Sequence, residues 1–301
     1  MKANTACISC ITRQAMEAAQ QACDDPASVE RVLQCVLADI ATLDLSLSPP
    51  ELAQQIHRRL RQESHCDDPY AQLKAQSAAQ ALCLAHRAKA AIARASHPFE
   101  AALRFAIAGN VIDFSAFPID AATSADEAIA QALSQPIDRA MVQQLRTDLI
   151  HAKRVLLLAD NVGETFFDKL LIEQLPPHVE VIYAVKSAPV VNDATVADTL
   201  DAGIAAVAKV IDSGCDAPGT PLAQCSVSFK HHFDNADVVI AKGQANYETL
   251  SDVSREVYFL LQVKCVVLAE HLQLPLGSWV ISSNQQLRQQ ALTASAEAAV
   301  L

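Results

Sequence analysis

Asp160 and Asn161 stand side by side in the stretch "LLLADNVGETFF", between a run of leucines and an amphipathic segment. Asp193 lies in a later loop, after the apolar segments "VEVIYAVK" and "SAPVV". Carboxylate and amide oxygens, completed by water, are the ligands that hard divalent cations such as Mg²⁺ or Mn²⁺ prefer. These three side chains therefore predict a divalent-metal site, provided that the fold brings their loops together.

Groups that could bind an anion are expected near these oxygens. Glu164 falls in the first turn of the next expected helix, whose free N-terminal amides can receive a phosphate. Lys242 ends the segment "DVVIAK" and would supply positive charge, while Gly243 would let the backbone approach a ligand. A metal here would polarise a phosphoryl oxygen and acidify a bound water. The pattern is typical of a phosphoryl site.

Each of these residues also has a purely structural interpretation. Asp and Asn after a strand commonly form turns and cap helices, and Asp193 precedes "ATVADTL" as an N-cap would. Lys242 is equally well explained as the solvated end of its strand. Their placement after different strands favours the functional interpretation, because the carboxyl ends of parallel strands meet at one edge of a sheet.

Asp198 is the rival candidate for the third metal ligand. If the loop after "VEVIYAVK" ends near Asn192 and Asp193, then Asp193 lies beside Asp160 at the carboxyl edge of the sheet. Asp198 should fall more than a turn into the following helix and be carried away from that edge at about 1.5 Å per residue. We therefore expect Asp193 to be the ligand and Asp198 to face solvent or cap a neighbour.

The elements that must position these loops change in character near residue 150. Residues 1–150 carry apolar residues at helical spacing and predict a helical domain. Residues 151–301 alternate short apolar runs with segments of helix length, which predicts a mainly parallel sheet covered on both faces. The expected strands are "RVLLLAD", "VEVIYAVK", "IAAVAKVID", "DVVIAKG", "KCVVLAE" and "SWVISS". The predicted fold class is α/β, a Rossmann-like α/β/α sandwich preceded by an all-helical N-terminal domain.

Composition narrows the class of protein. The chain has 301 residues, of which 51% are hydrophobic, a formal net charge of −11 and a pI near 5.2. This acidity argues against a nucleic-acid partner, because phosphate neutralisation needs clustered Lys and Arg. No apolar stretch approaches the roughly 18 residues of a membrane span, and the nine scattered cysteines suit a reducing compartment. We expect a cytoplasmic protein whose partner is a small metabolite.

Several enzyme classes lack their usual sequence motifs. With seven glycines, the chain contains no G-x-G-x-x-G, no Walker loop and no G-x-S-x-G elbow. The single C-x-x-C, Cys7 and Cys10, has no second pair to complete a zinc ribbon, and it opens a helix instead of following a strand. A packing role for this pair is favoured, and metal or thiol chemistry remains the alternative.

Several segments together resemble one family, the damage-control phosphatases, also known as domain of unknown function 89. The specific ones are "DNVGETFFDKLLIEQL", "PVVNDATVADTLDAG" and "DVVIAKGQANYETLSD", supported by "CISCITRQA", "DDPYAQLKAQS" and "AIAGNVIDF". The resemblance covers nearly the whole chain and is closest to the small stand-alone prokaryotic branch. It implies a helical N-terminal domain on an α/β/α core, and a phosphatase that uses Mn²⁺, Co²⁺, Ni²⁺ or Mg²⁺.

The resemblance also assigns roles to particular residues. It implies that Asp160, Asn161 and Asp193 are metal ligands. Residues that match its substrate-side loop and a helical-domain motif facing the cleft are Lys242, Asn246, Tyr247, Gly109, Asn110 and Asp113. The implied substrates are small phosphometabolites, including sugar phosphates and phosphopantetheine-like compounds.

Two departures and two rival functions accompany the resemblance. The chain reads "QSAAQ" at 76–80 where the family often has Asn, and Val162 stands where Ala is usual. The first departure affects the substrate face of the helical domain, and the second is a conservative packing change. Related eukaryotic proteins have been described as methyltransferases acting on protein carboxylates, although the absent glycine loop weighs against that activity. A non-catalytic phosphometabolite-binding protein is the other alternative.

Overall fold

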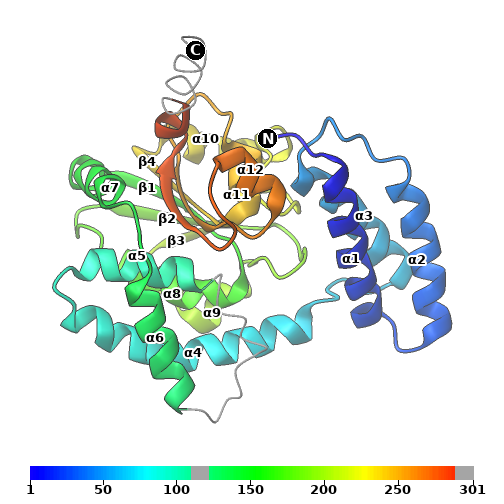
Figure 1. The fold of residues 1–301 in the computed structure, drawn as a ribbon, viewed down its shortest axis with the longest axis horizontal. Helices are drawn as coiled ribbons and strands as arrows, with labels where there is room; N and C mark the ends of the chain where they lie inside the picture. Colours follow the sequence, from blue (N-terminus) through cyan, green and yellow to red (C-terminus); the bar gives the residue numbers. More distant parts are fainter. Residues whose placement is uncertain (110–121, 289–301) are drawn as a thin grey trace.

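The described chain, residues 1–109 and 122–288 of this computed structural model, contains one sheet of six strands in the order β3-β2-β1-β4-β5-β6 (Figure 1). The strands are β1 (Arg154–Leu158), β2 (Glu180–Val185), β3 (Lys209–Asp212), β4 (Val238–Lys242), β5 (Tyr258–Gln262) and β6 (Trp279–Ser283). All neighbouring pairs are parallel except β5 with β6, which is antiparallel. The predicted mainly parallel sheet is confirmed.

Both faces of this sheet are buried, because side chains alternate along each strand. In β1, Val155 and Leu157 belong to one hydrophobic core, whereas Leu156 and Leu158 belong to another. Helices α4, α5, α7 and α8 contribute to the first core, and α10, α11 and α12 contribute to the second. Burial on both sides explains why the strands read as continuous apolar runs.

The helices of the described chain begin and end as follows: α1 (Thr5–Ala22), α2 (Pro26–Ile40), α3 (Pro49–Ser64), α4 (Ala71–Arg94), α5 (Pro98–Ala108), α6 (Ala122–Ser134), α7 (Arg139–His151), α8 (Thr165–Ile172), α9 (Thr199–Ala202), α10 (Val227–Asn235), α11 (Gly243–Leu250) and α12 (Val266–Leu272). Short 3₁₀ turns cover Val162–Glu164, Ile204–Ala206 and Leu222–Gln224. None of these helices is both long and apolar enough to cross a membrane.

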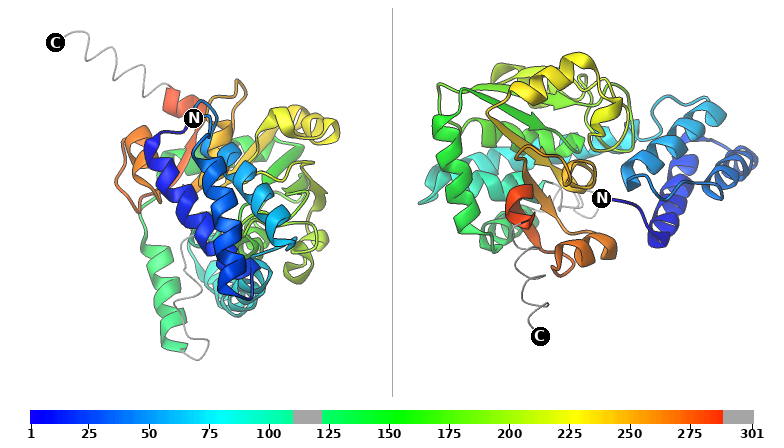
Figure 2. Two further views of the ribbon diagram at one scale, coloured as in Figure 1. Left: turned by 90° about the vertical axis from the view of Figure 1, so that its right-hand side faces the viewer. Right: turned by 90° about the horizontal axis from the view of Figure 1, so that it is seen from above.

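Helices α1, α2 and α3 share a core of their own, which includes Ile11, Val36 and Leu52. They lie together to one side of the sheet, apart from α4, α5 and α6 (Figures 1 and 2). The described elements before β1 are helical, as the sequence predicts. Their packing differs, however, because α4, α5 and α7 share a core with the sheet. The division into residues 1–150 and 151–301 stays a prediction.

One expected strand is wrong. The segment "KCVVLAE" forms helix α12, with Cys265 as its N-cap, and the strand between β4 and β6 is instead formed by "YFLLQ" in β5. Both lie in one long apolar stretch, from Val257 to Leu268, in which periodicity alone does not locate the strand. The paired valines at 266–267 have a high β-propensity, but packing of Leu268 into the core decides the local structure.

Candidate metal and phosphate site

The candidate residues lie at the carboxyl edge of the sheet, beside the point where the strand order reverses. β1 is flanked by β2 on one side and by β4 on the other, so chain connections diverge there. Asp160 and Asn161 follow β1, Lys242 ends β4, and Asp193 lies in the loop after β2. Such a switch point is where open α/β sheets bind ligands.

Backbone hydrogen bonds join the loops after β1 and β2. The Ala194 amide donates to the Asp160 carbonyl oxygen at 2.8 Å, and the Val162 amide donates to the Asn192 carbonyl oxygen at 3.0 Å. Asn161 and Asp193 form an isolated antiparallel bridge between these two bonds. The side chains of Asp160, Asn161 and Asp193 are therefore brought together, as the sequence analysis required.

Val191, next to this pairing, has a φ of 46°. Positive φ is unfavourable for a β-branched residue and costs about 1–3 kcal/mol in such cases. The Asp193 amide donates to the Val190 carbonyl oxygen at 3.1 Å across the same tight turn. Backbone strain is thus held directly beside the candidate ligand, a common location for strain in functional sites.

The two carboxylates are buried, with Asp160 6% and Asp193 3% exposed. Burial raises the pKa of Asp160 well above its ordinary value, and the negative charges of Glu164 and Asp193 raise it further. Burial also raises the pKa of Asp193 to about 6, although Lys186 opposes the effect. Two adjacent buried carboxylates resist ionisation unless a cation neutralises them.

This donor set fits a divalent cation. The buried Oδ2 of Asp193 has no hydrogen-bond partner, and its ion pair with the Lys186 ammonium spans 3.5 Å. The described residues contain no group of three or more His, Cys, Asp or Glu side chains that could hold a metal. The candidate set differs from such a group because its third donor is the Asn161 amide. Asp160, Asn161 and Asp193 would hold the metal.

Gly243 allows Asp160 to reach its position. The glycine has a φ of 78°, and a Cβ atom built on it would lie 1.8 Å from Asp160 Oδ2. Any side chain at residue 243 would therefore displace the carboxylate. The sequence predicts that this glycine makes room for a ligand, whereas the structure shows that it makes room for the Asp160 side chain.

Lys242 lies beneath the site, fully buried between two carboxylates. Its Nζ donates to Glu164 Oε2 and to Asp168 Oδ1, both at 2.7 Å. The Tyr183 hydroxyl donates to the other oxygen of Asp168 at 2.8 Å. Burial alone would lower the pKa of Lys242, but the charges of Asp168 and Glu164 outweigh it and raise that pKa. A direct contact of Lys242 or Glu164 with substrate stays a prediction.

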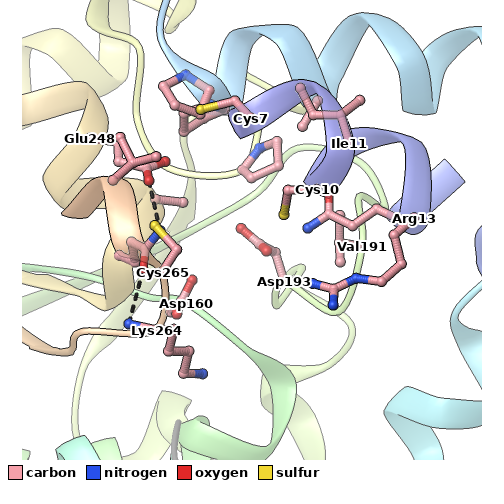
Figure 3. Close-up of a pocket in the computed structure, with 18 of the residues that line it drawn as sticks. Cys7, Cys10, Ile11, Arg13, Asp160, Val191, Asp193, Glu248, Lys264 and Cys265 are labelled. Atoms are coloured by element: carbon pink, nitrogen blue, oxygen red, sulfur yellow. Dashed lines mark hydrogen bonds between the residues drawn. The ribbon is translucent and has the colours of Figure 1, made fainter. Parts of the chain in front are cut away.

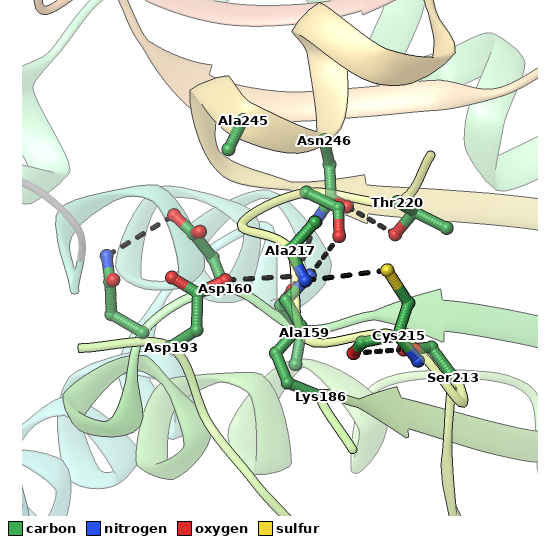
Figure 4. A network of polar contacts seen from close by, with 12 residues as sticks. Ala159, Asp160, Lys186, Asp193, Ser213, Cys215, Ala217, Thr220, Ala245 and Asn246 are labelled. Carbon is green, nitrogen blue, oxygen red and sulfur yellow. Dashed lines mark hydrogen bonds and ion pairs between the residues drawn. The ribbon is translucent and has the colours of Figure 1, made fainter. Parts of the chain in front are cut away.

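The other candidate substrate residues have mainly structural contacts. Asn246 is fully buried: its Nδ2 donates to the carbonyl oxygens of Ala159 and Lys242, at 3.0 and 2.7 Å, and its Oδ1 accepts from the Thr220 hydroxyl at 2.7 Å (Figure 4). It thereby ties the end of β1 to the end of β4. Tyr247 packs edge-on against Phe259, with ring centroids 4.9 Å apart.

Three residues of the helical-domain motif were also predicted to face the cleft. Gly109 packs closely on the loop after β1, because a Cβ there would lie 2.8 Å from a ring carbon of Phe167 and 3.3 Å from the Cα of Glu164. Asn110 and Asp113 lie outside the described residues. Substrate contacts by these residues and by Asn246, Tyr247 and Gly243 stay predictions.

The position of Asp198 differs from the prediction. Asp198 lies at the N-cap of α9, directly before Thr199, and not a turn inside the helix as predicted. It accepts hydrogen bonds from the Thr195 amide and hydroxyl and forms an ion pair of 3.1 Å with Lys74.

Lys186 is a charged neighbour of the candidate ligands that the sequence analysis overlooked. The sequence feature that could have identified Lys186 is its position at the end of "VEVIYAVK", which is equivalent to that of Lys242 after "DVVIA".

Lys186 is buried and bridges two loops. Its ammonium contacts the Asp193 carboxylate and also donates to the carbonyl oxygen of Gly219 (Figure 4). Lys186 thus pairs with Asp193, whereas the ion pairs of Lys242 involve Glu164 and Asp168. The candidate site therefore has two buried ammonium groups, one just after β2 and one at the end of β4, the strands on either side of β1.

A pocket of about 390 Å³ opens at the three candidate ligands. Its opposite wall comes from α1, α3, α11 and the start of α12, as Figure 3 shows for part of the lining. The charged, thiol and amide side chains on that wall are those of Cys7, Cys10, Arg13, Gln14, Gln244, Glu248, Lys264 and Cys265. The sequence analysis missed this contribution, apart from the packing role that it favoured for the cysteine pair.

Comparisons with known proteins agree with the resemblance read from the sequence. The family model described as "Damage-control phosphatase ARMT1-like domain" matches residues 3–280. A damage-control phosphatase of Pyrococcus horikoshii is 33% identical over 292 residues, which cover 95% of this chain and 99% of that protein. One of Archaeoglobus fulgidus is 29% identical over 289 residues, covering 93% and 98%. A crystal structure of a DUF89 family protein from Pyrococcus horikoshii matches with a TM-score of 0.87 and 33% identity, over 94% of this chain and 99% of that one.

Proposed function

Since this chain belongs to the ARMT1-like damage-control phosphatase family, we propose that it is a divalent-metal-dependent phosphatase that hydrolyses small phosphorylated metabolites. The family supports a phosphatase with a damage-control role. The metal dependence and the substrate class are the parts that we add. The observation that carries them is the buried pair Asp160 and Asp193, joined by Asn161 at the switch point of the sheet.

The metal requirement follows from the chemistry of this donor set. Two buried carboxylates with raised pKa values and an adjacent amide form a site that a hard cation would stabilise. When bound, such a cation supplies Lewis acidity toward a phosphoryl oxygen and lowers the pKa of a bound water. Asp160, Asn161 and Asp193 would hold it.

The substrate is small because the pocket is small. A volume of about 390 Å³ is in the range of sites for metabolites, and it lies close to the candidate ligands. Arg13 and Lys264 line the same pocket from α1 and from the segment before α12, and Figure 3 shows them on different sides of the acidic residues. Two cations beside a metal site suit an anionic phosphomonoester, such as a sugar phosphate or a phosphopantetheine-like compound.

A phosphatase screen with metal-free protein tests this function. Protein treated with a chelator should release no phosphate from a panel of sugar phosphates and phosphopantetheine compounds. Activity should return with Mn²⁺, Co²⁺, Ni²⁺ or Mg²⁺. The transition metals are expected to act at lower concentration than Mg²⁺, because a given site generally binds divalent transition metals more tightly. Full turnover by metal-free protein would contradict the metal requirement. Tight binding of phosphometabolites without turnover under any metal would instead indicate a binding protein.

A further inference from the structure

We propose that Glu164, Lys242 and Asp168 are positioning residues that fix the amide of Asn161, so that its oxygen is the atom left to bind the metal. The inference rests on the proposed metal site and extends it inward by two layers of side chains. The question is which side-chain atom of Asn161, the oxygen or the nitrogen, faces the proposed metal. Neither the position of Asn161 in the sequence nor its place among the candidate ligands answers it.

The contact between Asn161 and Glu164 admits one orientation of the amide. Asn161 Nδ2 lies 2.8 Å from Glu164 Oε1 and 3.3 Å from Asp160 Oδ2, so it donates toward both carboxylates. An ionised carboxylate only accepts hydrogen bonds. If the amide were reversed, its Oδ1 would face an acceptor at 2.8 Å without a proton between them. The carboxylate of Glu164 therefore keeps the nitrogen of Asn161 on its own side.

Glu164 is itself held by a group of fixed polarity. Lys242 Nζ contacts Glu164 Oε2 at 2.7 Å, and an ammonium carries only donors. The same Nζ contacts Asp168 Oδ1 at 2.7 Å, and the hydroxyl of Tyr183 donates to Asp168 Oδ2 at 2.8 Å. Each donor in this series of hydrogen bonds meets an acceptor. The direction of the hydrogen bonds is therefore set from the core of the sheet outward to Asn161.

The burial of this cluster makes a purely stabilising role a poor explanation. Glu164, Asp168 and Lys242 are each 0% exposed, and Tyr183 is too. Removing three charges from water is costly, and well-packed apolar residues often replace buried ion pairs with no loss of stability. A rigid and directional support for a metal ligand does require polar groups, since outer partners of this kind orient ligands and tune metal affinity.

An isosteric substitution that reverses one hydrogen bond tests the inference. In Glu164→Gln, the new Oε1 is drawn to Lys242, which leaves Nε2 facing Asn161 and turns the Asn161 oxygen away from the metal. Binding of Mn²⁺ alone, measured by calorimetry or by the electron paramagnetic resonance of free Mn²⁺, should weaken about 10–100-fold, as is usual for lost outer partners. Glu173→Gln, at the opposite end of α8 where Glu173 pairs with the exposed Lys89, should bind Mn²⁺ like wild type.

A second substitution should restore what the first removes. In the double variant Glu164→Gln, Asn161→Asp, residue 161 accepts from Gln Nε2 with one oxygen and offers the other to the metal, at the same net charge as wild type. Mn²⁺ affinity should recover at least tenfold relative to Glu164→Gln alone. Glu164→Asp keeps the charge but withdraws the acceptor from Asn161, so it should weaken Mn²⁺ binding even if Glu164→Gln fails to fold.

The outcomes separate this inference from the proposed function. Wild-type protein that binds none of the four metals would overturn both. Wild-type binding together with unchanged affinity in Glu164→Gln or in Glu164→Asp would overturn the positioning role alone. A double variant that binds no more tightly than Glu164→Gln would do the same, because a merely structural role predicts no rescue. Thermal unfolding of the metal-free variants shows whether a loss of binding reflects a loss of folding.

Discussion

The two walls of the pocket differ in how firmly their polar groups are held. On the sheet wall, Asp160 and Asp193 are at most 6% exposed, and the loops that carry them are joined by backbone hydrogen bonds. On the α1 wall, Arg13 is exposed and Cys10 is half-buried. The sheet wall is preorganised, as catalytic groups must be, whereas the α1 wall suits recognition that can adapt to the substrate.

The attachment of the first three helices explains this difference. Helices α1–α3 have their own core, and α3 makes polar contacts with the loop after β3. Arg58 and Arg61 on α3 both pair with Asp216, at 2.5 and 2.8 Å, and Arg61 also donates to the Pro189 carbonyl oxygen. Although burial opposes ionisation of Asp216, these partners lower its pKa to about 2. The core of α1–α3 is thus separate from the two cores of the sheet, with Val191 packed against it and ion pairs joining α3 to the loop after β3.

The largest expected effect is on the sheet wall. Asp193→Asn removes a charged donor from the candidate metal site, and since outer partners already contribute about 10–100-fold, loss of this ligand should weaken metal binding and turnover at least about 100-fold. Asp198→Asn is the matched control, because Asn can still accept from the Thr195 amide and Lys74 keeps its ion pair with Asp68. Its cost in stability should stay within about 1 kcal/mol.

Metal titrations and phosphate release by both variants measure this contrast. Normal metal binding by Asp193→Asn, with Asp198→Asn inactive, would transfer the ligand role to Asp198 and remove the reason for calling the sheet wall the chemical one.

Sequence reasoning found the sheet wall because its residues follow strands. Apolar runs located Asp160, Asn161, Asp193 and Lys242, and parallel strands imply a shared edge. It did not find that Lys242 is enclosed by carboxylates, since the partner Asp168 lies inside an ordinary amphipathic helix. Nor could it separate β5 from α12, because one apolar stretch serves both.

The α1 wall was mostly unpredictable for a different reason. Arg13 and Gln14 lie on an amphipathic helix whose polar face looks like any solvated surface. Their place at the pocket depends on how α1 docks beside the sheet edge, and that docking uses contacts over long separations in sequence. The cysteine pair was noticed only because its spacing is unusual.

The second expected effect concerns Glu248, on the part of the pocket lining that α11 contributes. Burial raises the pKa of Glu248 from 4.5 to about 7, although the hydrogen bond from Gln244 opposes it. The folded state therefore keeps a proton that the unfolded state loses, so stability falls as pH rises from 4.5 through 7. Glu248→Gln should be about 3 kcal/mol more stable than wild type at pH 8 and equal to it near pH 4, an order-of-magnitude figure.

Chemical unfolding of metal-free protein across this pH range measures the difference. The exposed Glu17 on α1 provides the control, since Glu17→Gln should leave the pH dependence of the unfolding free energy unchanged. A Glu248→Gln variant whose advantage is the same at pH 4 and pH 8 would show that Glu248 is not protonated in the folded state.

A smaller effect is expected from the cationic side chain on the α1 wall. Arg13→Gln should raise KM about 10-fold and change kcat no more than about twofold, because an exposed cation that binds the substrate anion contributes equally to ground state and transition state. Arg31→Gln, on the solvated face of α2, should change neither constant. A fall in kcat at unchanged KM would place Arg13 among the preorganised groups and blur the distinction between the walls.

The smallest effect is expected from the thiols beside Arg13. Cys7 is buried and Cys10 half-buried, and burial raises the pKa of both, so neither is a thiolate nucleophile near neutral pH. The double variant Cys7→Ser, Cys10→Ser should keep kcat/KM within about twofold and lose about 1 kcal/mol of unfolding free energy, as the hydroxyl of Ser packs less well than sulfur. Cys83→Ser, exposed on α4, is the control. If activity disappeared while the unfolding free energy stayed the same, the thiols would act on the substrate, and the α1 wall would carry chemistry as well as recognition.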